Sequence, residues 1–166
     1  MKFGDGVEQA IHSVAMLSGL SADGVLSAAA LAEFHGVSAS YLLKHLQALS
    51  KAGILSTLPG PKGGYRLAKP PSKITLLDIV LAVEGTEYAF RCHEIRQRGP
   101  NPVGNHLFSK PCNISATMLR AERVYRAELA KTTIADLGVQ LAEIDDGSIA
   151  ARGCAFLELH ERKTAR

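Results

Sequence analysis

The sequence predicts a mainly α-helical fold with one small β-hairpin. Apolar residues recur at helical spacing in five segments, which are residues 5–20, 27–35, 38–51, 75–84 and 113–131. Between the third and fourth segments, residues 54–58 and 65–67 have the composition of strands, and the Pro/Gly-rich residues 59–64 favour a turn between them. Two short helices followed by a hairpin are typical of a helix-turn-helix with a β-hairpin wing.

Polar residues and glycines mark the expected ends of these helices. A short polar side chain before a helix accepts backbone N–H hydrogen bonds of its first turn, and glycine adopts the left-handed conformation that ends a helix. The expected caps are Asp5, Ser27, Ser38, Thr75 and Asn113. Residues 138–166 mix short apolar pieces without a clear period, so no element is predicted there, and residues 160–166 have the composition of a solvated end.

Composition excludes several classes of protein. Of the 166 residues, 46% are hydrophobic and 21% are charged, and no apolar run approaches the ~20 residues of a membrane span. Asp5 and Glu8 lie where a signal peptide would be apolar. We therefore expect a cytoplasmic protein without a membrane partner.

The third helix and the hairpin form a basic segment. No acidic residue occurs between Glu33 and Asp78, and this window contains Lys44, Lys51, Lys62, Arg66, Lys69 and Lys73. A segment of one charge sign indicates a surface that contacts phosphates. It predicts binding to double-stranded DNA, and a winged-helix protein–protein interaction module is the alternative.

A long helix over residues 113–131 carries one narrow apolar stripe, which could pack on its own domain or on a second copy of the chain. Winged helices usually read duplex DNA as two-fold pairs, so we expect a homodimer on a pseudo-palindromic operator. The half-sites would lie about one helical turn, ~34–36 Å, apart.

The loop over residues 86–112 concentrates groups that could bind a metal or react with oxidants, namely Cys92, His93, Glu94, His106 and Cys112. Three hypotheses remain open: a 2Fe–2S cluster held by Cys92 and Cys112 with some of the other groups, a Cys92–Cys112 pair that forms a disulfide, or structural cysteines without a cofactor. Cys154, next to apolar residues, is expected to be a small core residue. A catalytic cysteine would need a positioned base, which this loop does not indicate, so we expect no enzymatic activity.

Three stretches of the sequence together resemble one known family. Tyr41–Leu49 with Lys51–Leu55, the wing Gly60–Ala68, and Ile74–Ile79 with Ala82–Gly85 are similar to the Rrf-two family of bacterial transcription regulators, which includes IscR, NsrR and CymR. The resemblance covers roughly residues 1–137 and implies a dimeric, DNA-binding transcription regulator, in most cases a repressor. It implies helix contacts to DNA from Ser38, Ser40, Tyr41, Lys44 and His45, and wing contacts from Pro61, Lys62, Gly63 and Gly64. His45 could equally be packed beside its leucines.

The resemblance also implies a redox or iron–sulfur sensor before the long helix. Cluster-binding members carry three closely spaced cysteines there, whereas this chain has Cys92 followed by Arg98 and Gly104, with Cys112 only later. The expected organisation is a winged helix-turn-helix DNA-binding domain at 1–85, a sensor loop at 86–112, a dimerisation helix at 113–137 and a C-terminal extension at 138–166.

Overall fold

The computed structural model describes residues 4–101 and 103–163, and the expectations for residues 1–3 and 164–166 lie outside this range. The chain is mostly helical with a small antiparallel hairpin, which confirms the predicted fold class. The α-helices are α1 Asp5–Leu17, α2 Ala28–His35, α3 Ala39–Lys51, α4 Leu76–Glu84, α5 Asn113–Leu129, α6 Ile134–Ile144 and α7 Ser148–His160. The strands are β1 Gly24–Val25, β2 Leu55–Leu58, β3 Gly64–Leu67 and β4 Arg162–Lys163, and short 3-10 helices are η1 Pro71–Lys73, η2 Ile95–Gln97 and η3 Asn105–Phe108.

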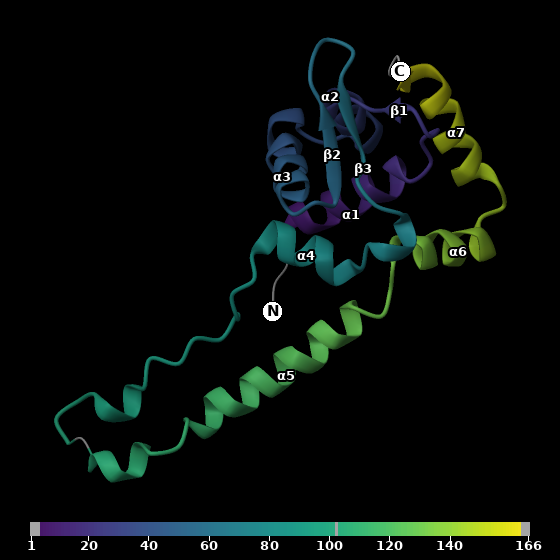
Figure 1. The fold of residues 1–166 in the computed structure, drawn as a ribbon. Helices are drawn as coiled ribbons and strands as arrows, with labels where there is room; N and C mark the ends of the chain where they lie inside the picture. The colour runs from purple at the N-terminus through teal and green to yellow at the C-terminus, as the bar shows by residue number, and fades with distance from the viewer. Residues whose placement is uncertain (1–3, 102, 164–166) are drawn as a thin grey trace.

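Helices α2 and α3 form the predicted helix-turn-helix (Figure 1). Ser27 caps α2 because its hydroxyl accepts a first-turn N–H at 3.1 Å, and Gly36 ends α2 with a left-handed φ of 65°. This φ costs glycine little and lets the chain turn before α3. On α3, Leu42, Leu46 and Leu49 are fully buried, so the predicted inner stripe of this helix is confirmed.

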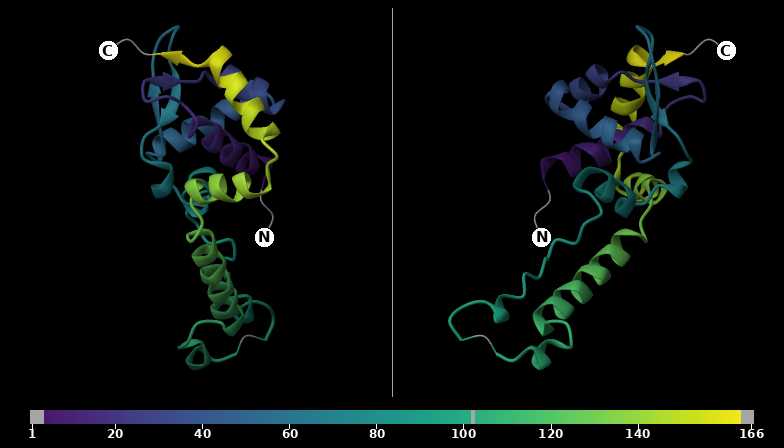
Figure 2. Two further views of the ribbon diagram at one scale, coloured as in Figure 1. Left: turned by 90° about the vertical axis from the view of Figure 1, so that its right-hand side faces the viewer. Right: turned by 60° about the vertical axis from the view of Figure 1, so that its left-hand side comes forward.

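Strands β2 and β3 form the wing, paired antiparallel with Leu55 opposite Leu67. Strand β3 of the wing is joined to the segment after β1, because Leu26 and Tyr65 exchange two backbone hydrogen bonds of 3.1 and 2.7 Å. On its other side β1 pairs with β4. Segments from both ends of the chain therefore lie beside the wing (Figure 2).

The hydrophobic core lies among α1, α2, α3, α4 and the base of the wing. Ile134 of α6 belongs to the same core, with 3% of its surface exposed, and its N–H donates to the Ile74 carbonyl at 2.9 Å. The predicted cap of α4 is confirmed, because Thr75 and Asp78 exchange reciprocal side-chain to backbone hydrogen bonds. We call residues 4–85 with 130–163 the head.

Residues 86–129 form an arm that leads away from the head (Figures 1 and 2). The loop runs outward from α4 through η2 and η3, and α5 returns beside it. Most of α5 is open to solvent, and Glu122 is its buried residue. The arm therefore holds most of its polar and apolar groups outside the hydrophobic core of the head.

The C-terminal region, in which the sequence indicated no element, contains α6, α7 and β4. Helix α6 begins at a capping box of Thr133 and Asp136, and it crosses residue 138, where the extension was expected to start. Helix α7 has no buried residue, and Gly138 and Gly153 lower the helix propensity of α6 and α7. Helix α7 escaped prediction because its apolar period is weak and tertiary packing of a few side chains supports it. Helix α6 does carry local signals that were overlooked, namely its capping box and apolar residues at helical spacing, Ile134, Leu137 and Leu141.

Four local expectations are wrong. Asp5 is the first residue of α1 rather than its cap, which is Gly4. Asn113 is likewise the first residue of α5, and Cys112 occupies the cap position. Ser38 does occupy the cap position of α3 but makes no cap hydrogen bond. Cys154, expected in the core, is exposed, because its neighbours on α7 pack against the core instead.

Candidate nucleic-acid interface and cysteine site

Helix α3 presents a polar, basic side to solvent. Ser38, Ser40, Tyr41 and Lys44 are all exposed, and Tyr41 has 45% of its surface open. The hydroxyls of Ser38 and Ser40 lie 3.0 Å apart and share a hydrogen bond, so Ser38 does not cap the first turn of α3. N–H groups at the start of a helix attract anions such as phosphate, and this arrangement leaves them accessible.

His45 differs from the other predicted contacts on α3, because only 7% of its surface is exposed. Its ring lies against Gly6 of α1, where a Cβ atom would come within 2.3 Å of Cε1, and it meets Tyr41 edge-on with ring centroids 4.7 Å apart. Burial, followed by the nearby Lys44 charge, lowers the pKa of His45. The ring therefore packs α3 on α1, and a DNA contact from His45 stays a prediction.

The tip of the wing exposes Pro61 and Lys62, whereas Gly63 is half-buried and Gly64 is buried. A Cβ atom on Gly63 would lie 2.0 Å from the Leu58 carbonyl oxygen, and one on Gly64 would lie 2.4 Å from a carbonyl oxygen after β1. These two glycines permit a close approach of backbones and shape the turn. Pro61 and Lys62 are the groups that the wing offers to a ligand.

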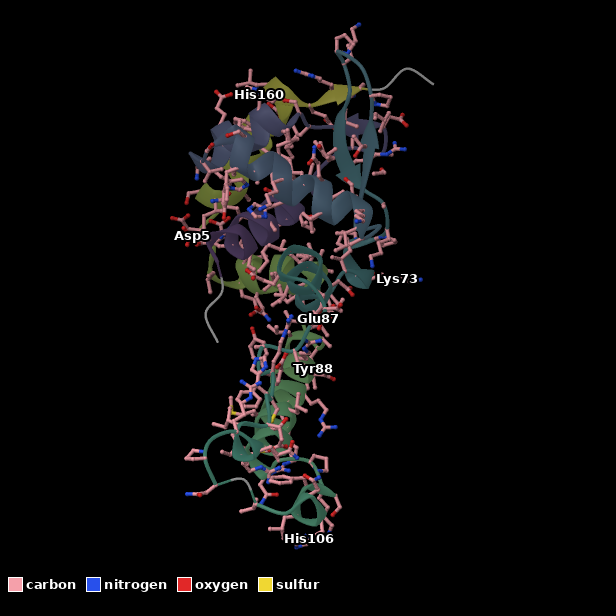
Figure 3. The ribbon with its side chains drawn as sticks, turned by 90° about the vertical axis from the view of Figure 1, so that its left-hand side faces the viewer. Asp5, Lys73, Glu87, Tyr88, His106 and His160 are labelled. Atoms are coloured by element: carbon pink, nitrogen blue, oxygen red, sulfur yellow. The ribbon has the colours of Figure 1, made fainter. Side chains whose placement is uncertain are left out.

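Within the arm, the structure brings together three of the predicted sensor residues. One ligand atom each of Cys92, Glu94 and Cys112 lie within 4.8 Å of one another. Cys92 is exposed, Cys112 is half-buried, and both are free thiols. His93 and His106, also predicted, are not in this group among the described residues, and Figure 3 shows His106 at the far end of the arm.

Helix geometry and charge act on this cysteine site. Backbone N–H groups of Ser115 and, to a smaller extent, Ile114 lower the pKa of the Cys112 thiol, and Arg96 and Cys92 act in the same direction. These N–H groups are at the open start of α5, where the helix dipole favours a thiolate. Cys112 occupies the cap position of α5, so the start of this helix favours its thiolate form.

Arg96 covers the carboxylate of this site. Its guanidinium donates to both oxygens of Glu94, with Nη2 and Oε2 2.8 Å apart, and this hydrogen bonding holds the pKa of Glu94 below its ordinary value. The same guanidinium lies over the Phe108 ring, 4.9 Å from its centroid. Arg96 thus links η2 and η3 and occupies the oxygens that a metal would take.

The backbone at Glu94 is strained. Its φ is 47°, which is a left-handed conformation, and among the described residues no other non-glycine residue has a positive φ. Such a conformation costs about 1–3 kcal/mol and persists where the surroundings enforce it. The strained residue is the one that aims its carboxylate at the two thiols.

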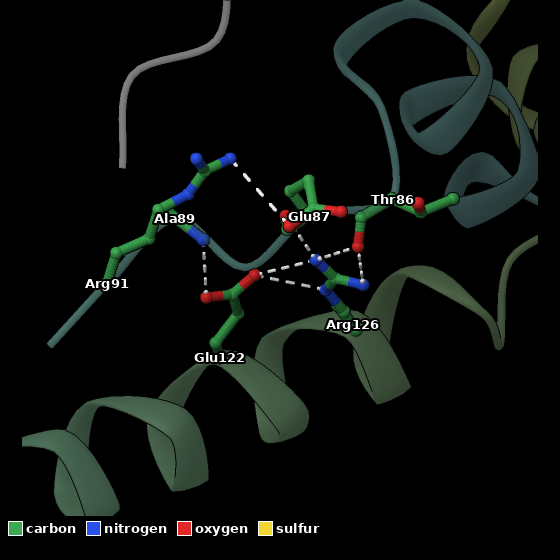
Figure 4. Close-up of polar contacts among 6 residues, drawn as sticks. All are labelled: Thr86, Glu87, Ala89, Arg91, Glu122 and Arg126. Atoms are coloured by element: carbon green, nitrogen blue, oxygen red, sulfur yellow. Dashed lines mark hydrogen bonds and ion pairs between the residues drawn. The ribbon is translucent and has the colours of Figure 1, made fainter.

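Two side chains of α5 hold the start of the arm loop, as Figure 4 shows. Glu122 accepts the Ala89 N–H at 2.9 Å and pairs with Arg126 at 2.8 Å. Arg126 donates to the carbonyl oxygens of residues 86 and 87 and lies over the Tyr88 ring, 4.7 Å from its centroid. Glu122 and Arg126 were not predicted from the sequence, although their i, i+4 spacing was an available signal.

Comparison with known proteins supports the fold and the class of protein. Residues 3–140 match the family model Rrf2, described as "Iron-dependent Transcriptional regulator". The crystal structure of CymR, titled the global cysteine regulator of B. subtilis, superimposes with a TM-score of 0.64 at 21% identity, over 84% of this chain and 98% of that chain. The fold is therefore that of winged helix-turn-helix transcription regulators.

Sequence relatives agree with this class. YffB of Lactococcus lactis, named as a candidate HTH-type transcriptional regulator, is 30% identical over 82% of this chain and 86% of its own length. YwgB of Bacillus subtilis, named in the same way, is 44% identical, but the match spans about half of each protein, 51% of this chain and 54% of YwgB. The chain belongs to the Rrf2 family of transcriptional regulators, as its resemblance to the Rrf-two family implied. In the described residues, no helix has the length and apolarity needed to cross a membrane.

Proposed function

We propose that the chain is a homodimeric transcription regulator that binds a pseudo-palindromic DNA operator through α3 and the wing. The observation that carries this proposal is the acid-free segment between Glu33 and Asp78, which forms α3 and the wing. Lys44 on α3 and Lys62 at the wing tip are exposed on the two elements that a winged helix places on DNA. The membership in a family of transcriptional regulators supports the same assignment.

The arm supports the dimer. Helix α5 leaves large apolar side chains in solvent, including Ile114 at 66%, Met118 at 44% and Val124 at 71% exposure. A 17-residue helix that contacts its own head so little gains stability by packing on a second copy. A two-fold pair then presents two α3 helices to successive major grooves.

Lys62→Ala tests the DNA-binding surface. Removing one phosphate contact lowers the slope of log affinity against log salt by about 1 and weakens binding to all duplexes to a similar degree. Binding is measured by fluorescence anisotropy over a series of salt concentrations. Lys131→Ala, which removes an exposed charge from the connection between α5 and α6, is the matched control. Equal curves for Lys62→Ala and the wild type would contradict the role of the wing.

We further propose that Cys92 and Cys112 control DNA binding, and the first form of this control is an iron–sulfur cluster. Two thiols and a carboxylate gathered within 4.8 Å fit three positions of a site that usually has four ligands. Cys92 and Cys112 would hold the group, and Glu94 would join them after leaving Arg96. A second copy of the chain could supply the remaining ligand. When bound, such a cluster would supply a charge that changes with its oxidation state.

The second form of control is a disulfide, favoured by the lowered pKa of Cys112. A peroxide would oxidise the Cys112 thiolate to a sulfenic acid and leave as the alcohol or water. The Cys92 thiol would then attack that sulfur, forming the S–S bond and releasing water. In total, two electrons pass from the two thiols to the peroxide.

The absorption spectrum of anaerobically purified protein, with iron and sulfide assays, separates these forms. A coloured protein with two irons per site supports the cluster. A colourless protein that gains a Cys92–Cys112 link with peroxide supports the disulfide. A colourless protein that forms no link, and whose DNA affinity does not change with peroxide, would leave the cysteines structural and refute the proposed control.

A further inference from the structure

The C-terminal extension packs on the helix-turn-helix. Phe156 of α7 meets Phe34 of α2 with ring centroids 4.9 Å apart and stacks on His160 at 4.0 Å. Arg152 donates to the Phe34 carbonyl at 3.1 Å and lies over its ring, 4.5 Å from the centroid. These contacts hold α7 on α2, the first helix of the helix-turn-helix. This segment lies beyond residue 140, where the match to the family model ends.

After α7, hydrogen bonds between Glu161 and Ser21 hold the chain near β1 and the wing. Both the backbone N–H and the hydroxyl of Ser21 donate to Glu161 Oε1, at 2.7 and 2.6 Å. A Cβ atom on Gly24 would lie 1.8 Å from the same oxygen, so glycine leaves the space that Glu161 fills. Strand β4 then pairs with β1, with Arg162 opposite Val25. This register places the side chain of Arg162 beside the wing. The left view of Figure 2 shows β4 next to the wing.

Arg162 makes two contacts with the wing tip. Its Nη1 donates to the carbonyl oxygens of Pro61 at 3.0 Å and of Gly63 at 3.3 Å. These two carbonyls belong to the residues on either side of Lys62. Within the tip, the Gly63 N–H donates to the Gly60 carbonyl at 2.9 Å, and the Lys62 side chain is exposed. A guanidinium, with several donors in a fixed plane, suits such a pair of acceptors.

We propose that Arg162 is a positioning residue, which holds the wing tip so that Lys62 meets the phosphate backbone of duplex DNA. The inference rests on the proposed DNA-binding function and adds to it a residue outside the family match. Arg162 orders the loop before DNA arrives, so that less conformational entropy is lost when the complex forms. The C-terminal extension is thus a part of the DNA-reading head.

The test uses the full-length protein and a mixed-sequence duplex of about three helical turns, with anisotropy as the readout. Arg162→Ala removes two hydrogen bonds and weakens binding about tenfold, which corresponds to roughly 1.4 kcal/mol. Arg162→Gln keeps an N–H₂ donor without the charge and restores part of the affinity. Lys163→Ala, which removes the same charge from the same strand, is the matched control and has a smaller effect.

A double-mutant cycle distinguishes positioning from a general structural role. If Arg162 acts through the wing tip, Arg162→Ala costs less affinity in a Lys62→Ala background than in the wild type, because the two losses are coupled. Additive losses, or equal losses in Arg162→Ala and Lys163→Ala, would overturn the inference while the proposed function stands. A wild-type protein without salt-dependent binding to the duplex would overturn both. Urea unfolding of each variant verifies that the head remains folded.

Discussion

At the scale of single residues, the position of Cys112 has a measurable consequence. The N–H groups of Ser115 and Ile114 lower its pKa, so more of the thiol is ionised at a given pH than in an unfolded chain. The rate of alkylation by iodoacetamide, followed by peptide mass mapping over a pH series, has its midpoint below the ~8.5 of a free cysteine.

The same protein in urea provides the reference for Cys112. Unfolding removes the helix N-terminus, and the midpoint then rises to the ordinary value. A midpoint in the folded protein that equals or exceeds the midpoint in urea would show that the start of α5 does not activate this thiol.

Gly6 and His45 form a second testable contact between α1 and α3. A Cβ atom on Gly6 would lie 2.3 Å from one ring atom of His45 and 2.5 Å from another. The Gly6→Ala substitution therefore overpacks a buried contact, and we expect the free energy of unfolding in urea to fall by about 1–3 kcal/mol.

Gly138→Ala is the matched control, because a Cβ atom there meets no atom within 4 Å. In the interior of α6 this change stabilises by about 0.5–1 kcal/mol. Without the His45 ring, the new Cβ atom no longer overpacks the contact. The double variant Gly6→Ala/His45→Ala should therefore lose less stability than the sum of the losses in the two single variants. A Gly6→Ala variant as stable as the wild type would mean that the ring of His45 moves aside freely.

At the scale of elements, Glu122 fastens the loop of the arm to α5. Glu122→Ala removes the acceptor of the Ala89 N–H and leaves Arg126 without its carboxylate. We expect the amide of Ala89 to exchange with deuterium faster by an amount that corresponds to about 1–3 kcal/mol of local stability. Hydrogen exchange with mass spectrometry measures this loss over residues 86–91.

Glu128→Ala is the comparison for Glu122→Ala. It removes the exposed ion pair with Lys131, and exposed pairs contribute about 0–1 kcal/mol. Exchange in residues 86–91 should therefore stay at the wild-type rate in this variant. Equal protection in both variants would mean that the loop is held by something other than Glu122.

Local signals predicted residues 4–85 of the head well, because the helices and strands there carry their own information. Ser27, Gly36 and the leucine stripe of α3 specify the helix-turn-helix through hydrogen bonding and burial within a few residues. The extension was not predictable in this way, since the contacts of Glu161 and Arg162 join residues about 100 or more apart in sequence. Cys92, Glu94 and Cys112 were all named as candidates from the sequence, whereas no local pattern reveals the strained φ of Glu94 or the distance of His106 from this group.

At the scale of the whole molecule, the exposed apolar residues of α5 predict the assembly. Ile114→Glu combined with Met118→Glu places charges in the expected helix-to-helix contact, where desolvation without a partner is costly. Sedimentation equilibrium should then show a monomer for this variant, whereas we expect a dimer for the wild type. The affinity for an operator with two half-sites should fall as well, because each head then binds alone.

Ile144→Glu provides the control for this change, since Ile144 is an apolar residue on α6 that is more exposed than Ile114 and Met118. We expect it to leave the dimer intact. Dissociation of the Ile144→Glu variant, together with an unchanged mass of the α5 variant, would place the contact between copies on the head instead of the arm.

The burial of Ile134 in the core limits which fragments of the chain can fold on their own. A fragment that ends at residue 85 would lack this side chain, which is 3% exposed, and the N–H that it donates to Ile74. It would also leave β1 as an unpaired edge and deprive Ser21 of its carboxylate partner. Unpaired edges and exposed apolar surface favour aggregation. The head is therefore discontinuous in sequence: the arm is an insertion within it, and removing the arm while rejoining residues 85 and 130 is the division that respects its core.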